Sequence, residues 1–142
     1  TQSKSNESIS ILSIDIDSFD LDCVNNLKSI SPRLICIEYN SKFNHNLALK
    51  IKYKKDYSWK MDDYFGSSLK SIDIIMNNNN YKLVATNITG SNAFYVKNEL
   101  INKCITKDQS IGSLYSPPNF DLFNYNITHS STNKYLIDKL NE

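Results

Sequence analysis

The sequence predicts an α/β fold whose sheet is mostly parallel and ends in an antiparallel hairpin. Three patterns lead to this prediction: a strand–helix–strand unit over residues 9–37, a second helical pattern from about residue 69, and two β-type runs over residues 81–96 joined by a glycine-containing turn. A strand–helix–strand unit with short connections favours a parallel pair with a right-handed crossover. The chain of 142 residues is long enough for one domain with its own core.

The first strand is predicted over residues 9–16, a short run rich in Ile and Leu that ends in acidic residues. Ser18 is a candidate cap for the helix that follows. One face of that helix is apolar at helical spacing and consists of Cys23, Val24, Leu27 and Ile30. Pro32 ends the helix, and residues 34–37 form the second strand.

A long polar and aromatic loop is predicted over residues 41–64. Ser67 and Ser68 are candidate caps for a second helix with the apolar stripe Leu69, Ile72, Ile75 and Met76. Strands over residues 81–88 and 92–96 flank a three-residue turn, which favours an antiparallel hairpin. We therefore divide the chain into a loose segment (1–8), an α/β domain (9–100) and a helical or irregular tail (101–142), with helix candidates at 100–105 and 134–140.

Composition argues against several classes of function. The net charge of +1 gives no electrostatic reason to expect binding to nucleic acid or to an anionic membrane. The three glycines, Gly66, Gly90 and Gly112, lie too far apart for a glycine-rich phosphate loop. No apolar run approaches a membrane span and no signal peptide is visible, so we expect a cytoplasmic protein with reduced cysteines.

Four short segments resemble blocks of FkbM-type methyltransferases, in the same order. Leu12 to Asp20 is similar to the Ile-Asp-x-Asp/Glu-Gly-x-Asp/Glu segment of that family, with Ser18 in place of the usual Gly. The other blocks are Ile37 to Asn40, Asp63 to Leu69 and Thr89 to Val96. Together the blocks cover roughly residues 9–100.

The resemblance implies a partial Rossmann-like sheet, the C-terminal half of a class I S-adenosylmethionine-dependent methyltransferase, with its last strand inserted antiparallel. The parent enzyme's cofactor would be S-adenosylmethionine, and its reaction methyl transfer to an oxygen of a small molecule or glycan. The family's glycine-rich loop and ribose-binding acid have no counterpart in this sequence. We therefore assign no cofactor-binding residue and expect the chain alone to be inactive.

Acidic and amide side chains follow both strands of the first unit. Asp15 and Asp17 end the first strand, and Glu38 and Asn40 end the second. Ligands of open α/β sheets bind beyond these strand ends, so we expect the side chains to converge. Asp15 and Asp17 are the candidate catalytic residues, as a general base in the parent enzyme.

Oxygen ligands at this edge also suit a divalent cation. The resemblance implies the candidate metal ligands Asp15, Glu38 and Asn40, because some related O-methyltransferases use acidic and amide ligands at the ends of these two strands. The alternatives are structural. Asp17 and Asp20 are also suited to capping the following helix, and Glu38 to an ion pair with a lysine.

Aromatic residues of the long loop are candidates for an acceptor pocket. Tyr57, Trp59 and Tyr64, together with Asn92 of the fourth block, are the candidate substrate-binding residues. The alternative is that the rings only pack the loop onto the domain. A second interpretation of the chain is a non-enzymatic module that forms a homodimer through the exposed edge of the strand over residues 9–16.

Overall fold

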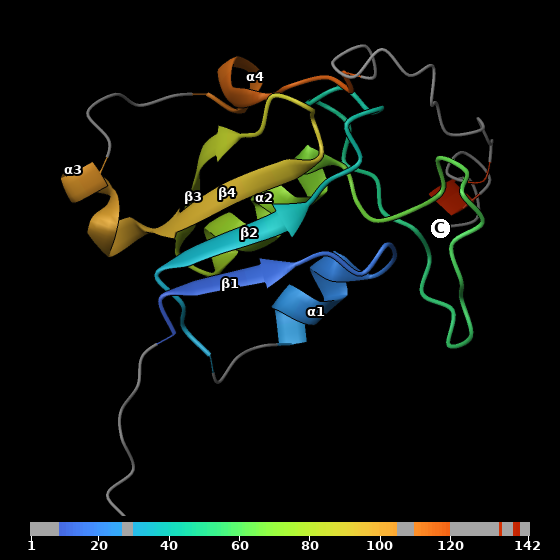
Figure 1. The fold of residues 1–142 in the computed structure, drawn as a ribbon, viewed down its shortest axis with the longest axis horizontal. Helices are drawn as coiled ribbons and strands as arrows, with labels where there is room; N and C mark the ends of the chain where they lie inside the picture. The colour runs from blue at the N-terminus through green and yellow to red at the C-terminus, as the bar shows by residue number, and fades with distance from the viewer. Residues whose placement is uncertain (1–8, 27–29, 105–109, 120–133, 135–137, 140–142) are drawn as a thin grey trace, which may run out of the picture.

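The structure is a computed structural model that describes residues 9–26, 30–104, 110–119, 134 and 138–139. One open sheet contains four strands: β1 (Ile11–Ile14), β2 (Leu34–Glu38), β3 (Tyr81–Thr86) and β4 (Asn92–Lys97). Their order in the sheet is β1-β2-β4-β3 (Figure 1). The fold is therefore α/β, as predicted, with a mixed sheet.

The mostly parallel sheet that was predicted is not confirmed. Only β1 and β2 pair in parallel, whereas β4 is antiparallel to both β2 and β3. The reason is the predicted hairpin, which is present: β4 turns back from β3 and inserts between β3 and β2. β3 thus runs in the same direction as β1 and β2 but never pairs with them.

The turn of the hairpin is longer than predicted and is closed by a side chain. It spans residues 87–91, because β3 ends at Thr86. The side-chain oxygen of Asn87 accepts hydrogen bonds from the backbone N–H groups of Ser91 and Asn92, at 2.8 and 2.9 Å. Gly90 supplies a left-handed conformation with φ of +73°.

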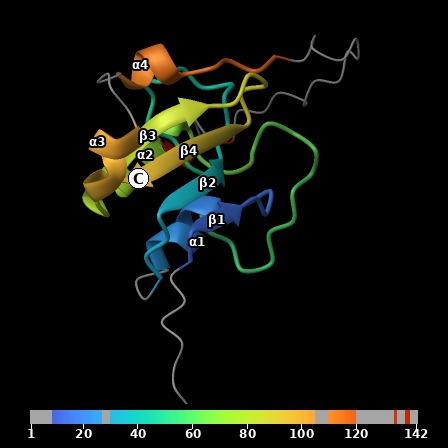
Figure 2. The same ribbon diagram turned by 60° about the vertical axis from the view of Figure 1, so that its left-hand side comes forward.

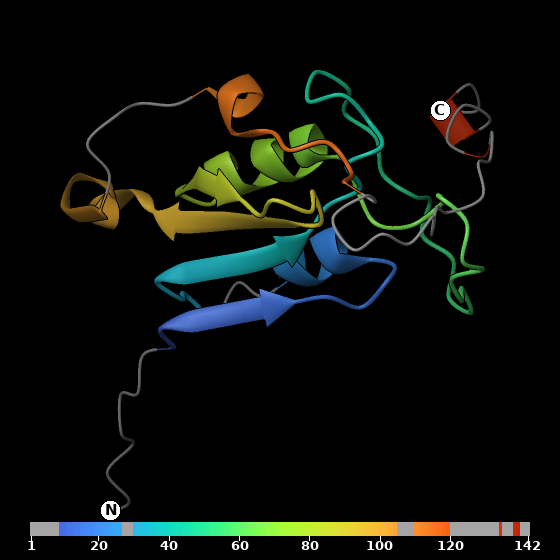
Figure 3. The same ribbon diagram turned by 45° about the horizontal axis from the view of Figure 1, so that its top comes forward.

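Helices α1 (Asp20–Asn26) and α2 (Leu69–Asn78) cover one face of the sheet (Figure 3). Ser68 caps α2, as predicted, and its hydroxyl accepts a hydrogen bond from the N–H of Ser71. In α1 the buried apolar residues are Leu21 and Val24, whereas the predicted face was centred on Cys23. The helix begins two residues after Ser18, and Leu27 of the predicted face lies outside the described residues.

The core lies between that face of the sheet and the two helices. Ile35 and Ile37 of β2 are in register with Tyr95 and Ala93 of β4, and all four side chains are buried. Because side chains alternate along a strand, Glu38 points to the opposite face, away from the helices. The alternation of β2 therefore decides on which side of the sheet its terminal carboxylate lies.

Several boundaries differ from the prediction. β1 is shorter than residues 9–16, and Ile9 and Ile16 at its flanks are exposed. After β4 come a 3-10 turn (Asn98–Leu100), α3 (Ile101–Cys104) and the unpredicted α4 (Ile111–Leu114). The segment 1–8 and most of the expected helix over 134–140 lie outside the described residues. Among the described residues, no helix has the length and apolar character needed to cross a membrane.

Candidate functional site

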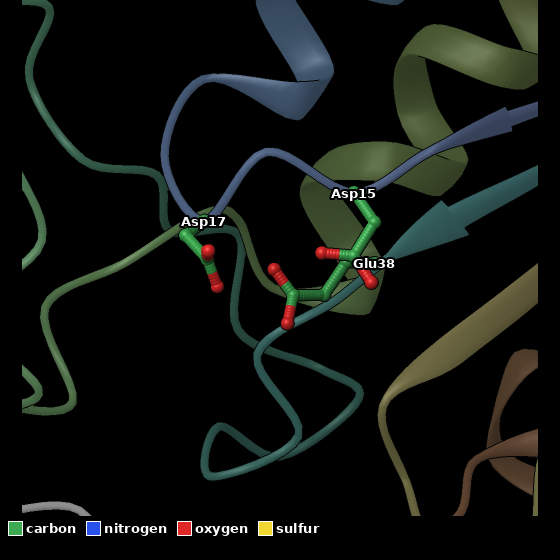
Figure 4. Close-up of side chains that lie close together, drawn as sticks. All are labelled: Asp15, Asp17 and Glu38. Atoms are coloured by element: carbon green, nitrogen blue, oxygen red, sulfur yellow. The ribbon is translucent and has the colours of Figure 1, made fainter.

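Three carboxylates meet where the parallel pair ends (Figure 4). Ile14 of β1 pairs with Ile37 of β2, so Asp15 and Glu38, the next residues on the two strands, lie side by side. One oxygen from each of Asp15, Asp17 and Glu38 lies within 4.8 Å of the others. The structure thus brings together both predicted catalytic residues, Asp15 and Asp17, and two of the three predicted metal ligands, Asp15 and Glu38.

The loop between β1 and α1 returns Asp17 to this cluster. Asp17 adopts a left-handed conformation with φ of 56°, which bends the chain sharply after β1. Ser18, which occupies the position where the resembling family has Gly, is not among the described residues with positive φ. The sharp bend therefore falls one residue before the position that the resemblance suggests.

Asp20 has a structural role in the same loop. Its carboxylate is buried and accepts hydrogen bonds from the N–H groups of Ile16 and Ser18, at 2.9 and 3.3 Å. Burial raises the pKa of Asp20, although the hydrogen bond from Ile16 opposes this effect. Its donors precede the helix, so this carboxylate closes the loop that carries Asp17.

Glu38 has the most perturbed carboxylate in the cluster. Burial raises its pKa to about 8, with further contributions from the negative charges of Asp15, Asp20 and Asp17. Its Oε2 atom is buried and has no hydrogen-bond partner among the described residues. No described lysine pairs with Glu38, so the structure does not contain the ion pair that was considered for it. Glu38 is therefore mainly protonated at neutral pH, and its ionised fraction, the form that can accept a proton, grows as the pH approaches 8.

Asn92 lies next to this carboxylate. It is the cross-strand partner of Glu38 in the β2–β4 pair, and partners of this kind place their side chains on the same face. Its Oδ1 atom lies 3.9 Å from Sγ of Cys36, two residues before Glu38 on β2. Asn92 thus offers an amide beside the acidic cluster.

Asn40, the third predicted metal ligand, fastens the long loop. Its side chain is buried and donates hydrogen bonds to the carbonyl groups of Asp63 and Phe65, at 2.8 and 3.3 Å. Its side-chain oxygen accepts a hydrogen bond from the N–H of Lys42 at 3.2 Å. The amide that the sequence suggested as a ligand is therefore engaged with the backbone of its own loop.

Two of the predicted substrate-binding aromatics pack the loop. Tyr64 is buried with Ile51, and its hydroxyl accepts a hydrogen bond from the N–H of Lys52. Burial raises the pKa of this hydroxyl to about 12. The hydroxyl of Tyr57 donates to the carbonyl of Tyr64. These contacts match the packing alternative that was left open for these rings.

Trp59 is partly exposed. Its indole N–H donates to the carbonyl of Asp62 at 2.7 Å, and its ring meets Phe65 edge-on at 5.6 Å between centroids. Sequence reasoning missed Phe19, whose ring lies 5.0 Å from that of Tyr53. The only sequence feature that pointed to Phe19 was its position two residues after Asp17. Its contact with Tyr53 could not be predicted, because the fold brings these two distant residues together.

Comparison with known proteins gives no relative for this chain. No family model, no curated protein and no solved structure matches it. The function must therefore be argued from the site itself.

Proposed function

We propose that this chain is the acceptor side of a methyltransferase-like α/β domain, in which Glu38 takes the proton from an acceptor hydroxyl group. The observation that carries the proposal is the state of Glu38, which combines a pKa of about 8 with a buried, unpartnered oxygen. A carboxyl group that titrates near neutral pH can both accept and release a proton under working conditions. Methyl transfer to oxygen requires such a proton acceptor.

The strand order supports the proposal. β4 inserts antiparallel between β2 and β3, and the resemblance implies the same arrangement for the last two strands of the domain. The acidic cluster lies beyond the carboxyl ends of β1 and β2, where open α/β sheets bind their ligands.

The neighbours of Glu38 have distinct roles in this proposal. The exposed carboxylates of Asp15 and Asp17 hold negative charge close to Glu38 and make it a stronger proton acceptor. The amide of Asn92 lies beside it across the strand pair and is placed to orient the acceptor hydroxyl. The proton acceptor is thus moved from Asp15 and Asp17, the sequence-based candidates, to the more buried Glu38.

S-adenosylmethionine enters this proposal only through the resemblance. The residues of this chain do not fit the cofactor on their own, because its three glycines are dispersed and make no phosphate- or carboxylate-binding loop. We therefore expect isothermal titration of the chain with S-adenosylmethionine to show no micromolar binding. Micromolar affinity would mean that the chain holds a site for S-adenosylmethionine, and it would contradict the expectation that the chain does not bind this cofactor on its own.

A divalent cation is the second candidate for the same carboxylates. Three oxygens within 4.8 Å are close enough to share one hard cation. In that case the cation would hold Glu38 as an ionised ligand with a lowered pKa, and the carboxylate would be too weak a base to take a proton from a hydroxyl group. The two candidates therefore predict opposite protonation states for one side chain.

A homodimeric interaction module remains the alternative to an enzyme. β1 is an edge strand, and Ile11 in its middle is 66% exposed. Exposed edges with apolar side chains recruit other strands. Light scattering tests this alternative: a dimer that Ile11→Lys dissociates would support it, and a monomer at high concentration would remove it.

Carbon-detected NMR titration of the glutamate carboxyl groups tests the proposal directly. We expect Glu38 to titrate near pH 8. A Glu38 that titrates in the ordinary range without added metal would contradict the proposal. Saturable binding of Mg²⁺ or Ca²⁺ at pH 7 that ionises Glu38, and that Asp15→Asn abolishes, would favour the cation instead.

A further inference from the structure

Lysines are concentrated in one loop, which contacts Phe19, in the segment between β1 and α1, and Asp22 of α1. Residues 50–61, which we call the lysine loop, contain five of the fifteen lysines of the chain: Lys50, Lys52, Lys54, Lys55 and Lys60. A general preference for lysine codons would spread the residues along the chain, so it does not account for this concentration. The loop projects away from the sheet (Figure 2).

Four of these five lysines are free to meet a ligand. Lys50 forms an ion pair with Asp22, with 3.7 Å between Nζ and Oδ1. The other four are exposed and make no ion pair with any residue that the structure describes. Asp56 is the only acidic residue among residues 50–61. The loop therefore carries unbalanced positive charge although the chain as a whole is nearly neutral.

An aromatic ring stands among these lysines and contacts the loop between β1 and α1. Tyr53 is 69% exposed, and its ring rests on Phe19 with 5.0 Å between centroids and 48° between planes. Phe19 also contacts the ring of Tyr57 at 5.5 Å. Since Phe19 follows Asp17 by two residues, Tyr53 contacts the same loop that carries Asp17.

We infer that the acceptor of this site is an acidic saccharide, bound by the lysine loop through its anionic groups and by Tyr53 through a sugar ring. The inference rests on the proposed function and names its substrate class. Lysine ammonium groups attract carboxylate or phosphate groups, and an exposed aromatic face packs on the apolar face of a sugar ring. The carboxylates at the strand ends accept hydrogen bonds from hydroxyl groups and repel anions. A ligand with hydroxyl groups at one end and negative charge at the other satisfies both parts.

Two other anionic partners fit the surface less well. A nucleic acid strand needs a continuous positive track, whereas the lysine loop contacts, through Tyr53 and Phe19, the segment that carries the acidic residues Asp15 and Asp17. A membrane surface needs a contiguous apolar face, and the large exposed apolar side chains of the lysine loop are Tyr53 and Met61, eight positions apart in sequence. Sugar hydroxyl groups, in contrast, can donate hydrogen bonds to carboxylate oxygens.

The fluorescence of Trp59, the single tryptophan of the chain, reports ligand binding because this residue lies in the lysine loop. The probe is a defined oligogalacturonate, compared with a neutral maltooligosaccharide of equal length, a single-stranded oligonucleotide and phosphatidylserine vesicles. We expect oligogalacturonate to bind more tightly than the other three. Equal or tighter binding of the oligonucleotide or the vesicles, or no binding of oligogalacturonate at all, would overturn the inference.

Matched variants locate the binding surface. Lys54→Gln with Lys55→Gln should weaken oligogalacturonate binding about tenfold, whereas Lys70→Gln on α2 should leave it unchanged. Tyr53→Ala should weaken binding of both the acidic and the neutral oligosaccharide. Equal effects of the loop and α2 substitutions would refute the assignment to the lysine loop.

The state of Glu38 is read separately from oligosaccharide binding. Fluorescence of Trp59 reports oligogalacturonate binding, and the NMR titration reports the protonation of Glu38, so the two readouts are independent. Binding that persists while Glu38 titrates as an ordinary glutamate would mean that the proposed function fails and the saccharide site stands. If Glu38 titrates near pH 8 but oligogalacturonate does not bind, the proposed function stands and the saccharide inference fails.

Discussion

Glu38 and Asp15 lie side by side because they are the first residues past a parallel pair in which Ile14 is in register with Ile37. The register alone brings two like charges together, and the bend at Asp17 adds a third. Repulsion within this group, combined with burial, favours the protonated form of Glu38. The arrangement lowers stability at neutral pH, which is common for groups placed for chemistry.

The pKa of Glu38 predicts that stability falls as pH rises. Its pKa is about 8 in the folded state and near 4.5 in the unfolded chain, so the folded state binds the extra proton between these values. The contribution of Glu38 to the free energy of unfolding is therefore fully present below about pH 4.5 and is lost as the pH rises toward 8. Thermal melting of the wild type should show this decline, and Glu38→Gln should flatten it. Parallel pH profiles for the two proteins would contradict the shifted pKa.

Asp17 should tolerate Gly better than Ala. Its φ of 56° is accessible to glycine and costs roughly 1–2 kcal/mol for a residue with a Cβ atom and no compensating contact. Both substitutions remove the same charge, so the comparison isolates the backbone. We expect Asp17→Gly to be more stable than Asp17→Ala by about 1 kcal/mol in urea unfolding. Equal stabilities would indicate a different conformation at this residue.

Removing the side chain of Asn40 should loosen the long loop. The substitution Asn40→Ala leaves two buried carbonyl groups and the N–H of Lys42 without their partner. We expect a loss of about 2–3 kcal/mol in the free energy of unfolding. The control is Asn44→Ala, because the exposed side chain of Asn44 accepts a hydrogen bond from the N–H of Asn46 in a turn, and its loss should cost well under 1 kcal/mol. Equal losses would contradict the role of Asn40 as the fastener of the loop.

Two glycines with positive φ should respond differently to substitution by alanine. At Gly66 no atom lies within 4 Å of an added Cβ, so Gly66→Ala should cost only the backbone penalty of about 1 kcal/mol. At Gly90 the added atom would meet the carbonyl oxygens of Pro117 and Ser116 at 2.4 and 2.8 Å. Gly90→Ala should therefore cost at least about 1 kcal/mol more, because the backbone of residues 116–117 must move. Similar melting points for the two variants would show that this segment does not pack against the turn.

The local sequence pattern was sufficient to predict those helices, strands and turns that depend on residues close together in the chain. The apolar run before Glu38 predicted β2, and Ser68 with the stripe from Leu69 to Met76 predicted α2 together with its cap. The hairpin followed from two β-type runs around Gly90. These features depend on propensity, periodicity and turn chemistry, which act between neighbours in the chain.

Pairing and burial required the fold. Which strand lies beside β2 depends on contacts between residues 54 to 62 positions apart, and no local pattern specifies the insertion of β4. The fold also decides the roles of the two polar side chains at the end of β2. The carboxyl group of Glu38 has a raised pKa, whereas the amide of Asn40 bonds the backbone of the long loop. Both are polar residues of one short segment, so the sequence alone does not predict which of them has which role. Burial separates them, because it makes an unpaired carboxylate hold its proton and makes an amide seek backbone partners.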